Sequence, residues 1–253
     1  MEIKKVTNFL ERIAPLELAE PFDNGKIGLI LDMQNDIKNI SVAVDPTKFV
    51  LEEAAEDKAD MLIVHHPPIF NSINKIPNDL AQILKIALDN NISIYAMHTN
   101  YDKADGGIND ALADFLKLKN LQNLPMGRIG ETSTFTYPDE YAKFVANAFD
   151  APVQMIGDLD AAVHRVMVIG GSGFSYASIE LAKANNVDAF ISSEIPHHLI
   201  RYAEDLDDLV LISATHYATE FPGMLGLVHS LRVLDVEPCF IPHIPKVKYF
   251  TDK

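Results

Sequence analysis

The sequence predicts an α/β protein built from two similar lobes, and two observations support this prediction. Short apolar runs such as Met61–Val64 and Ile92–Met97 alternate with stretches in which apolar residues recur at helical spacing. That alternation is typical of a largely parallel sheet covered by helices. A second series of the same kind, with strands expected at Arg165–Ile169, Ala189–Ser192 and Leu209–Ser213, follows after about residue 126. We therefore predict an internal duplication, with lobes at residues 1–125 and 126–253.

In the first lobe we expect a helix at Ile3–Ile13. Its apolar residues recur at helical spacing and share one face: Val6, Phe9, Leu10 and Ile13. Asp45-Pro46-Thr47 is expected to open a second helix, with Asp45 as its N-cap. Thr99–Gly107 is expected to be a loop. The remaining expected elements are strands at Ile27–Leu31 and Ile40–Val44 and helices at Asn78–Asn90 and from Ile108.

The second lobe is expected to begin near the segment Lys119–Gly130, whose proline and glycines are typical of a boundary. A last long helix at Thr219–Leu234 could pack back on the first lobe. The other expected elements are helices at Glu140–Phe149, Ser178–Asn185 and His198–Asp205 and strands at Val153–Ile156 and Cys239–Ile241.

Two pairs of segments suggest the repeat directly. Ala59–His66 and Val187–Glu194 each follow a helix, carry aspartate at the same place and run through a strand into polar residues. Ile94–Thr99 and Leu211–His216 each end a strand in histidine, and a carboxylate stands four residues after that histidine. Ligands gather at the carboxyl ends of the strands in open α/β sheets, so these positions are candidates for a site between the lobes.

Composition excludes several classes of protein. The chain has 253 residues, 48% of them hydrophobic, and a formal net charge of −15, which disfavours nucleic acid as a partner. No run approaches the roughly 20 apolar residues of a membrane span, and no signal peptide is evident, so a cytoplasmic location is expected. The single cysteine, Cys239, excludes an internal disulfide and a cysteine-rich zinc site.

The strand ends supply a metal-ligand set of imidazoles and carboxylates. His65 and His66 close the Met61–Val64 strand, and two prolines stop it. Such a pair could simply end the strand as polar residues, but the later His-x3-acid units favour metal binding. The predicted ligands are His65, His66, Asp102, His216 and Glu220. Five ligands exceed a closed tetrahedral site and suit two divalent ions bridged by a carboxylate.

Other residues have more than one interpretation. His98 lies beside the ligand set and is a tentative catalytic acid or base, or an orienting residue, or a packed strand-end histidine. His197 and His198 are expected at the surface or behind the ligands. Gly170–Gly173 could cradle a phosphate but is expected to be a tight turn, because it lacks the full dinucleotide fingerprint and the Walker lysine.

Several motifs together resemble one known family. The segments His65–Phe70, His98–Asp102, Gly106–Asp110 and His216–Glu220 are similar to the signature of the NIF-three-like family, whose members are often labelled GTP cyclohydrolase type-two-like proteins. Asp188–His198 also resembles a family segment. Phe22 stands where the family often has tryptophan, and the extra domain of longer relatives is missing.

The resemblance implies two similar α/β lobes around a dinuclear centre, with Glu220 as the bridge and iron, zinc, manganese or magnesium as the two ions. It also implies a toroidal homohexamer. The function expected is a hydrolase in which a metal-bound hydroxide attacks a small substrate, with GTP as the family-based candidate. The alternative is a metal-binding scaffold or interaction protein without catalytic activity.

Overall fold

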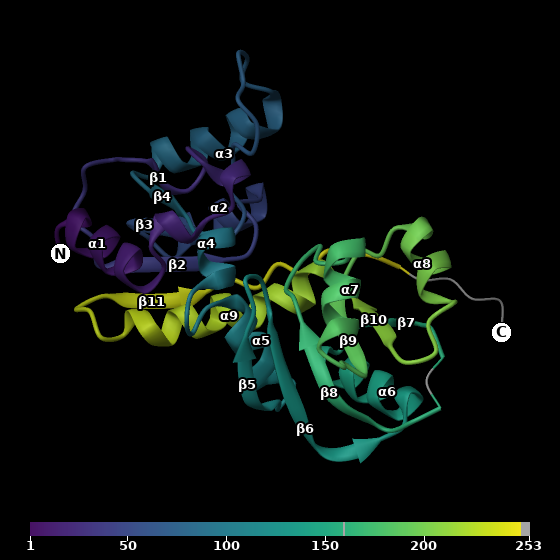
Figure 1. Cartoon of the computed structure of the whole chain (residues 1–253). Helices are drawn as coiled ribbons and strands as arrows, with labels where there is room; N and C mark the ends of the chain where they lie inside the picture. The colour runs from purple at the N-terminus through teal and green to yellow at the C-terminus, as the bar shows by residue number, and fades with distance from the viewer. Residues whose placement is uncertain (159, 249–253) are drawn as a thin grey trace.

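The computed structural model describes residues 1–158 and 160–248, and these residues form two β-sheets covered by helices (Figure 1). We call each sheet with its covering helices a lobe. In chain order the elements are α1 (Ile3–Ile13), the 3-10 turns η1 (Leu16–Leu18) and η2 (Pro21–Asp23), β1 (Gly28–Leu31), β2 (Asn39–Ala43), α2 (Lys48–Glu56), β3 (Met61–Val64), α3 (Asn78–Asp89), β4 (Ser93–Ala96), α4 (Thr99–Lys103), α5 (Ile108–Phe115), β5 (Lys119–Asn123), β6 (Arg128–Thr136), α6 (Pro138–Phe149), β7 (Gln154–Ile156), β8 (Val163–Val168), α7 (Tyr176–Ala184), β9 (Ala189–Ser193), α8 (His197–Ala203), β10 (Val210–Ala214), α9 (His216–Leu231) and β11 (Glu237–Phe240).

The two sheets share one arrangement of strands. The first sheet has the order β1-β4-β3-β2-β11, and the second has the order β5-β6-β8-β9-β10-β7. In both, three central strands are parallel and a short antiparallel strand flanks the third of them, β1 beside β4 and β7 beside β10. The α/β class is therefore confirmed, whereas descent from a duplication stays a prediction.

Two strands lie in a different sheet from the one that a division at residue 125 predicts for them. β5, from the segment expected to be a boundary, forms an antiparallel hairpin with β6 in the second sheet. β11, near the end of the described chain, pairs in parallel with β2 in the first sheet. The division at residue 125 stays a prediction, and the segment Lys119–Gly130 around it contains the edge strand β5 and the start of β6.

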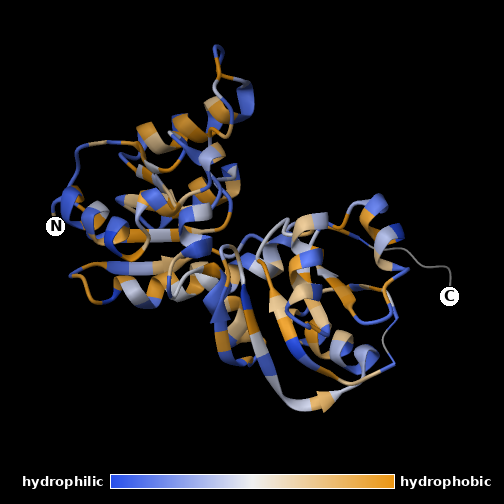
Figure 2. Cartoon of the chain, in the orientation of Figure 1, coloured by the Kyte–Doolittle hydropathy of each residue, from blue (hydrophilic) through white to orange (hydrophobic). Residues whose placement is uncertain are grey.

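Buried apolar side chains cover both faces of each sheet, and the end of the central strand β8 is orange, the colour of hydrophobic residues, in Figure 2. α9 takes part in both lobes, since Ala218 packs into the second lobe and Met224 and Leu227 pack into the first. Gly223 permits a close crossing of α9 with α5, because a Cβ there would lie 2.6 Å from Ile108 Cα. α5 and α9 thus lie between the two lobes and join them (Figure 1).

The predicted helix at Ile3–Ile13 and the central strands are confirmed, and two local predictions are corrected. The N-cap of α2 is Thr47, whose Oγ1 accepts the N–H of Val50 at 3.2 Å, so Asp45 is not the cap. Thr99–Gly107 is not wholly a loop, because its first five residues form α4. Among the described residues, no helix is long and apolar enough to cross a membrane.

Candidate metal site

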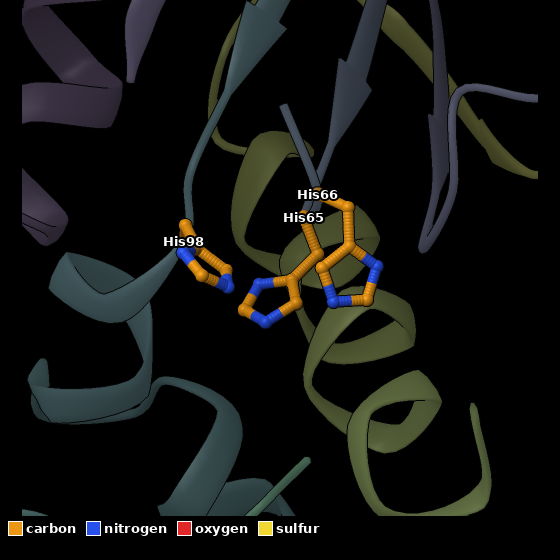
Figure 3. Close-up of side chains that lie close together, drawn as sticks. All are labelled: His65, His66 and His98. Atoms are coloured by element: carbon orange, nitrogen blue, oxygen red, sulfur yellow. The ribbon is translucent and has the colours of Figure 1, made fainter. Parts of the chain in front are cut away.

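The first lobe supplies three histidines at the ends of two adjacent strands. β3 and β4 are parallel, with Val64 paired to Ala96, so the residues that follow them lie side by side. His65 and His66 come from β3 and His98 from β4, and their rings gather in one place (Figure 3). The ring centroid of His65 lies 4.9 Å from that of His66 and 5.1 Å from that of His98.

The second lobe supplies its residues from the first turns of α9. Thr215 caps this helix by accepting the N–H of Ala218 at 3.2 Å. His216 and Glu220 lie one turn apart on the same face, as residues at i and i+4 do. His216 Nε2 is 2.9 Å from Glu220 Oε1, and the Glu220 side chain is 3% exposed. The expected start of the helix near Thr219 is three residues late, but the predicted spacing is confirmed.

All five predicted ligand residues converge, in two groups that share Glu220. In one group, His65 Nε2 lies 3.6 Å from Asp102 Oδ1 and 3.5 Å from Glu220 Oε1. In the other, His66 Nε2 lies 3.4 Å from Glu220 Oε2 and 3.3 Å from His216 Nε2. Ligand atoms of His66, His216 and Glu220 lie within 4.8 Å of one another, a spacing that could hold a metal ion.

Each of the four histidines is oriented by an acceptor at its Nδ1. A carbonyl or carboxylate can only accept, so Nδ1 carries the proton and Nε2 is presented to the site. These bonds run from His65 to Met97 O (2.8 Å), from His66 to Asp45 Oδ1 (2.7 Å), from His98 to Asp23 Oδ2 (2.8 Å) and from His216 to Glu194 Oε2 (2.9 Å). This arrangement of histidine and outer acceptor is typical of metal sites.

Polar atoms at the centre of the site have no partner among the described residues. They are His65 Nε2, Asp102 Oδ1 and Glu220 Oε2, all of them buried. Buried polar atoms are normally satisfied, because an unpaired one costs about 1–3 kcal/mol. Imidazole nitrogens and carboxylate oxygens are also ligands for divalent metals. These residues therefore fit a metal ion.

Gly171 leaves space for this site. Its φ of +65° lies in the left-handed region, and a Cβ there would lie 2.5 Å from Glu220 Oε1 and 3.2 Å from His216 Nε2. The neighbouring N–H groups are already used: that of Gly170 by Asn109 Oδ1, and that of Gly171 by Thr219 Oγ1. The interpretation of this segment as a tight turn is confirmed.

The field in the site favours positive charge. Burial acts to lower the pKa of His66, but the nearby carboxylates of Asp45 and Glu220 outweigh burial and raise the pKa to about 10. In the same way, burial is outweighed at His216, where Glu220 raises the pKa to about 9. Burial also acts to raise the pKa of Glu220, yet the nearby imidazoles, His65 first, hold it well below the usual value. A cation could take the place of these imidazole protons.

The remaining acids and bases differ from this group. Burial raises the pKa of Asp102 to about 7, against the opposing effect of His65. Burial and then the neighbouring His65 lower the pKa of His98 to about 4, so its ring is neutral at pH 7. Asp23, which is fully buried, holds His98 and also accepts the Thr99 N–H at 3.2 Å. His98 thus presents a neutral Nε2 toward the other rings.

A cavity of about 630 Å³ opens beside the candidate ligands and is lined by both lobes. His66, His98, Asp102, His216 and Glu220 reach it from one side. This volume is within the range of small-molecule sites, about 300–1,000 Å³. A ligand in the cavity would touch the histidine cluster directly.

Sequence reasoning missed the three supporting carboxylates and placed two histidines only loosely. Asp45 and Glu194 each stand within two residues of a strand end, so a polar residue just past a strand is the available signal for them, whereas Asp23, in the turn η2, has no such signal. His197 and His198 on α8 are exposed, and the ring of His198 packs on Tyr176 at 5.6 Å, so the surface interpretation is confirmed.

The sequence is similar to curated proteins over most of its length. A protein from Clostridium acetobutylicum named "GTP cyclohydrolase 1 type 2 homolog" is 31% identical over 247 residues, covering 92% of this chain and 90% of the relative. A protein of the same name from Methanocaldococcus jannaschii is 31% identical over 230 residues, covering 88% of this chain and 92% of the relative.

Solved structures share the fold. The structure titled "Reduced HcgD from Methanocaldococcus jannaschii" has a TM-score of 0.81 and 30% identity, covering 95% of this chain and 97% of that one. A Bacillus cereus protein related to NIF3 has a TM-score of 0.89 at 21% identity, with 99% of both chains covered, and supports the fold alone. The model of the family Duf34/NIF3 (NGG1p interacting factor 3) matches residues 1–246, and the chain belongs to this family.

Proposed function

We propose that the chain is a hydrolase that holds two divalent metal ions and acts on a small substrate in the cavity between the lobes. The observation that carries the proposal is the pair of ligand groups sharing Glu220, with unpartnered buried atoms at their centre. His65 and Asp102 would hold one ion, His66 and His216 the other, and Glu220 both. Ions so held lower the pKa of a bound water and supply a nucleophile near neutral pH.

The chain's own residues would position the reacting groups. Asp45 and Glu194 fix the ring orientations of His66 and His216, as distances of 2.7 and 2.9 Å to their Nδ1 atoms indicate. His98 is the candidate catalytic residue, because its neutral Nε2 borders the cavity and can accept a proton. Asp23 would stabilise the ring after that transfer, since its carboxylate already holds Nδ1.

The relatives' names suggest where a substrate search begins. Relatives are named "GTP cyclohydrolase 1 type 2 homolog", which makes opening of a heterocyclic ring by water a reasonable first reaction to assay. Water would add to an electrophilic ring carbon, a C–N bond would break, and a proton would pass to the leaving nitrogen. A homohexamer, also expected from the resemblance, is tested separately by light scattering.

The first experiment is elemental analysis of protein purified without chelator or affinity tag. We expect about two metals per chain in the wild type and little metal in the double variant His65→Ala with Glu220→Gln. His197→Ala is the matched control, because that histidine is exposed on α8 and should leave the metal content unchanged. Absence of metal in the wild type, even after addition of iron, zinc or manganese, would remove the basis of the proposal.

Activity separates the hydrolase from a metal-binding scaffold. Turnover of a heterocyclic substrate by the loaded protein, lost in Glu220→Gln and strongly reduced in His98→Gln, is the result expected for an enzyme. Full activity in Glu220→Gln would contradict the mechanism. Two tightly held metals without turnover on nucleosides, nucleotides or cyclic amides would favour the scaffold.

A further inference from the structure

The cavity has an aromatic wall made by the first lobe. Phe22, on η2, and Phe70, just after the His-His-Pro-Pro segment, both line the cavity beside His98. They are 54% and 42% exposed, which is large for phenylalanine. The ring of Phe70 meets that of His98 edge-on, at a centroid distance of 5.6 Å and an interplanar angle of 84°. Exposed rings in a concave site offer faces on which a flat ligand can stack.

The side-chain ammonium group of Lys26 lies close to the rings of both phenylalanines. Lys26 Nζ lies 4.3 Å from the ring centroid of Phe70 and 5.8 Å from that of Phe22. Contacts of this kind attract the ammonium to the ring faces. Phe22 also lies beside His98, with 6.4 Å between their ring centroids. The two phenylalanines therefore stand next to the candidate catalytic residue and not at a distant rim.

The second lobe completes the cavity with apolar side chains and with hydroxyls that are already bonded. Met126, Ile169 and Leu181 give an apolar surface. The hydroxyls of Ser175 and Ser178 form the capping box of α7. Few polar groups remain to recognise a highly polar ligand on this side.

Apart from the imidazoles of the metal site, the charged side chains at the cavity are acidic. The charged side chains that line it are Glu20, Asp102 and Glu220, and no lysine or arginine is among its lining residues in the described chain. Phosphates are usually bound by arginine, lysine or free N–H groups. The N–H groups of Gly170, Gly171 and Gly173 are all bonded within the protein. Lys26, beside the rings, and the cationic groups of the metal site could each meet a negative group, so without metal the cavity offers little to a phosphate chain.

We infer that the substrate carries a planar heterocycle of nucleobase or nucleoside type, which stacks on Phe22 and Phe70 beside His98, and that this ring and not a phosphate chain supplies the binding energy in the metal-free protein. The inference deepens the proposed function and rests on it for the reaction, but the ring-binding surface is independent of the metal. It also assigns Phe22 and Phe70 as specificity-determining residues.

The test is calorimetric binding of guanosine, adenosine and uridine, and of their triphosphates, to metal-free and to metal-loaded protein. We expect at least one nucleoside to bind to both forms, and to bind the metal-free form no more weakly than its triphosphate does. Phe22→Ala and Phe70→Ala should each raise its dissociation constant about tenfold or more, as loss of base stacking does. Phe22→Leu and Phe70→Leu, which keep an apolar side chain without the ring, should also weaken binding.

Phe135→Ala is the matched control, because Phe135 is 69% exposed on β6 and stacks on His164 outside the cavity. It should bind as the wild type does. The inference is overturned if every triphosphate binds the metal-free protein tenfold more tightly than its nucleoside, if no nucleoside binds, or if both alanine variants bind like the wild type. The metal content of the same samples separates the two ideas, since normal metal with a triphosphate preference in the metal-free form contradicts only the inference, and absent metal with intact ring binding contradicts only the proposed function.

Discussion

At the amino ends of the two sheets, Asp60 and Asp188 make the same contacts. Asp60 Oδ2 accepts the successive N–H groups of residues 38–39, at 2.8 and 2.9 Å. Asp188 Oδ2 accepts those of residues 164–165, at 2.9 and 2.7 Å. Each aspartate carbonyl also accepts the first N–H of the next parallel strand, at 3.0 Å in both lobes. In each sheet, an aspartate at the equivalent position therefore bonds to the starts of the neighbouring parallel strands.

At the carboxyl ends the lobes differ. When Asp60 and Asp188 are aligned, His65 and His66 correspond to Ser193 and Glu194. Glu194 does not join the ligand groups but holds His216, and it does so from a backbone φ of +57°, which non-glycine residues rarely adopt. The comparison teaches that strand order places side chains at the cleft, whereas the residue at each strand end decides whether the side chain binds or supports.

The largest effect should come from Gly171→Ala, which breaks the carboxyl-end arrangement. The new Cβ would need the space that Glu220 Oε1 and His216 Nε2 occupy, and the backbone there is left-handed. We expect metal content to fall to background while circular dichroism shows a folded chain. Gly226→Ala is the control, since a Cβ at that position of α9 meets nothing within 4 Å. Normal metal content in Gly171→Ala would show that Glu220 need not hold its present position.

The next largest effect is expected on stability, from the contacts that Arg128 makes between the lobes. Arg128, on β6, is 1% exposed, and its guanidinium pairs with Asp110 and donates to Ala104 O at 3.3 Å. Removing one partner of a fully buried pair typically costs about 3–5 kcal/mol, but Asp110 is 23% exposed, so the loss of its charged hydrogen bonds should cost about 1.5–3 kcal/mol. Arg128→Met should therefore lower the free energy of unfolding by about that amount in urea denaturation. Lys143→Met, which breaks an exposed pair with Glu140, should leave the midpoint unchanged. Equal midpoints for both variants would mean that the buried pair does not stabilise the fold.

Sequence patterns predicted the fold best where apolar spacing is regular. Met61–Val64 is a buried strand because it is a continuous apolar run, and the histidines after it reach the cleft for the same reason. β5 was missed because its side chains are polar and exposed and a proline and glycine follow it. α4 was missed because five residues cannot show a helical period.

Ligand residues could be predicted, but their supports could not. A histidine at a strand end is a local signal, whereas the partner of its Nδ1 is set by tertiary contact. Asp45 shows the difference: it was expected to cap α2, but Thr47 accepts that N–H, and the Asp45 carboxylate is left for His66. Nothing in the local sequence distinguishes the two uses of an acceptor before a helix.

The third prediction concerns Asp45 and Glu194, whose carboxylates orient the rings of His66 and His216. Asp45→Asn and Glu194→Gln should each weaken metal binding about 10–100-fold, because the outer carboxylate makes the imidazole a better ligand. Asp45 should show the larger effect, since its side chain is 34% exposed and that of Glu194 is 58% exposed. Titration with zinc against a competing chelator measures both. Glu237→Gln, in an exposed pair with Lys38, is the control. A larger loss in Glu194→Gln would mean that the strained backbone of Glu194 outweighs burial.

The smallest effect is expected at the amino ends of the two sheets, where the contacts of the two lobes are alike. Asp60→Ala and Asp188→Ala each remove two hydrogen bonds to backbone N–H groups at the start of a strand, which at about 0.5–1.5 kcal/mol each should cost about 1–3 kcal/mol in either lobe. Because the contacts match, the two losses should agree within about 1 kcal/mol, and metal content should stay normal since the ligands lie at the opposite ends of the strands. Urea unfolding with elemental analysis tests both points. If one variant is as stable as the wild type and the other is not, similar geometry does not mean equal contribution, and the amino ends of the two lobes differ in energy as their carboxyl ends differ in chemistry.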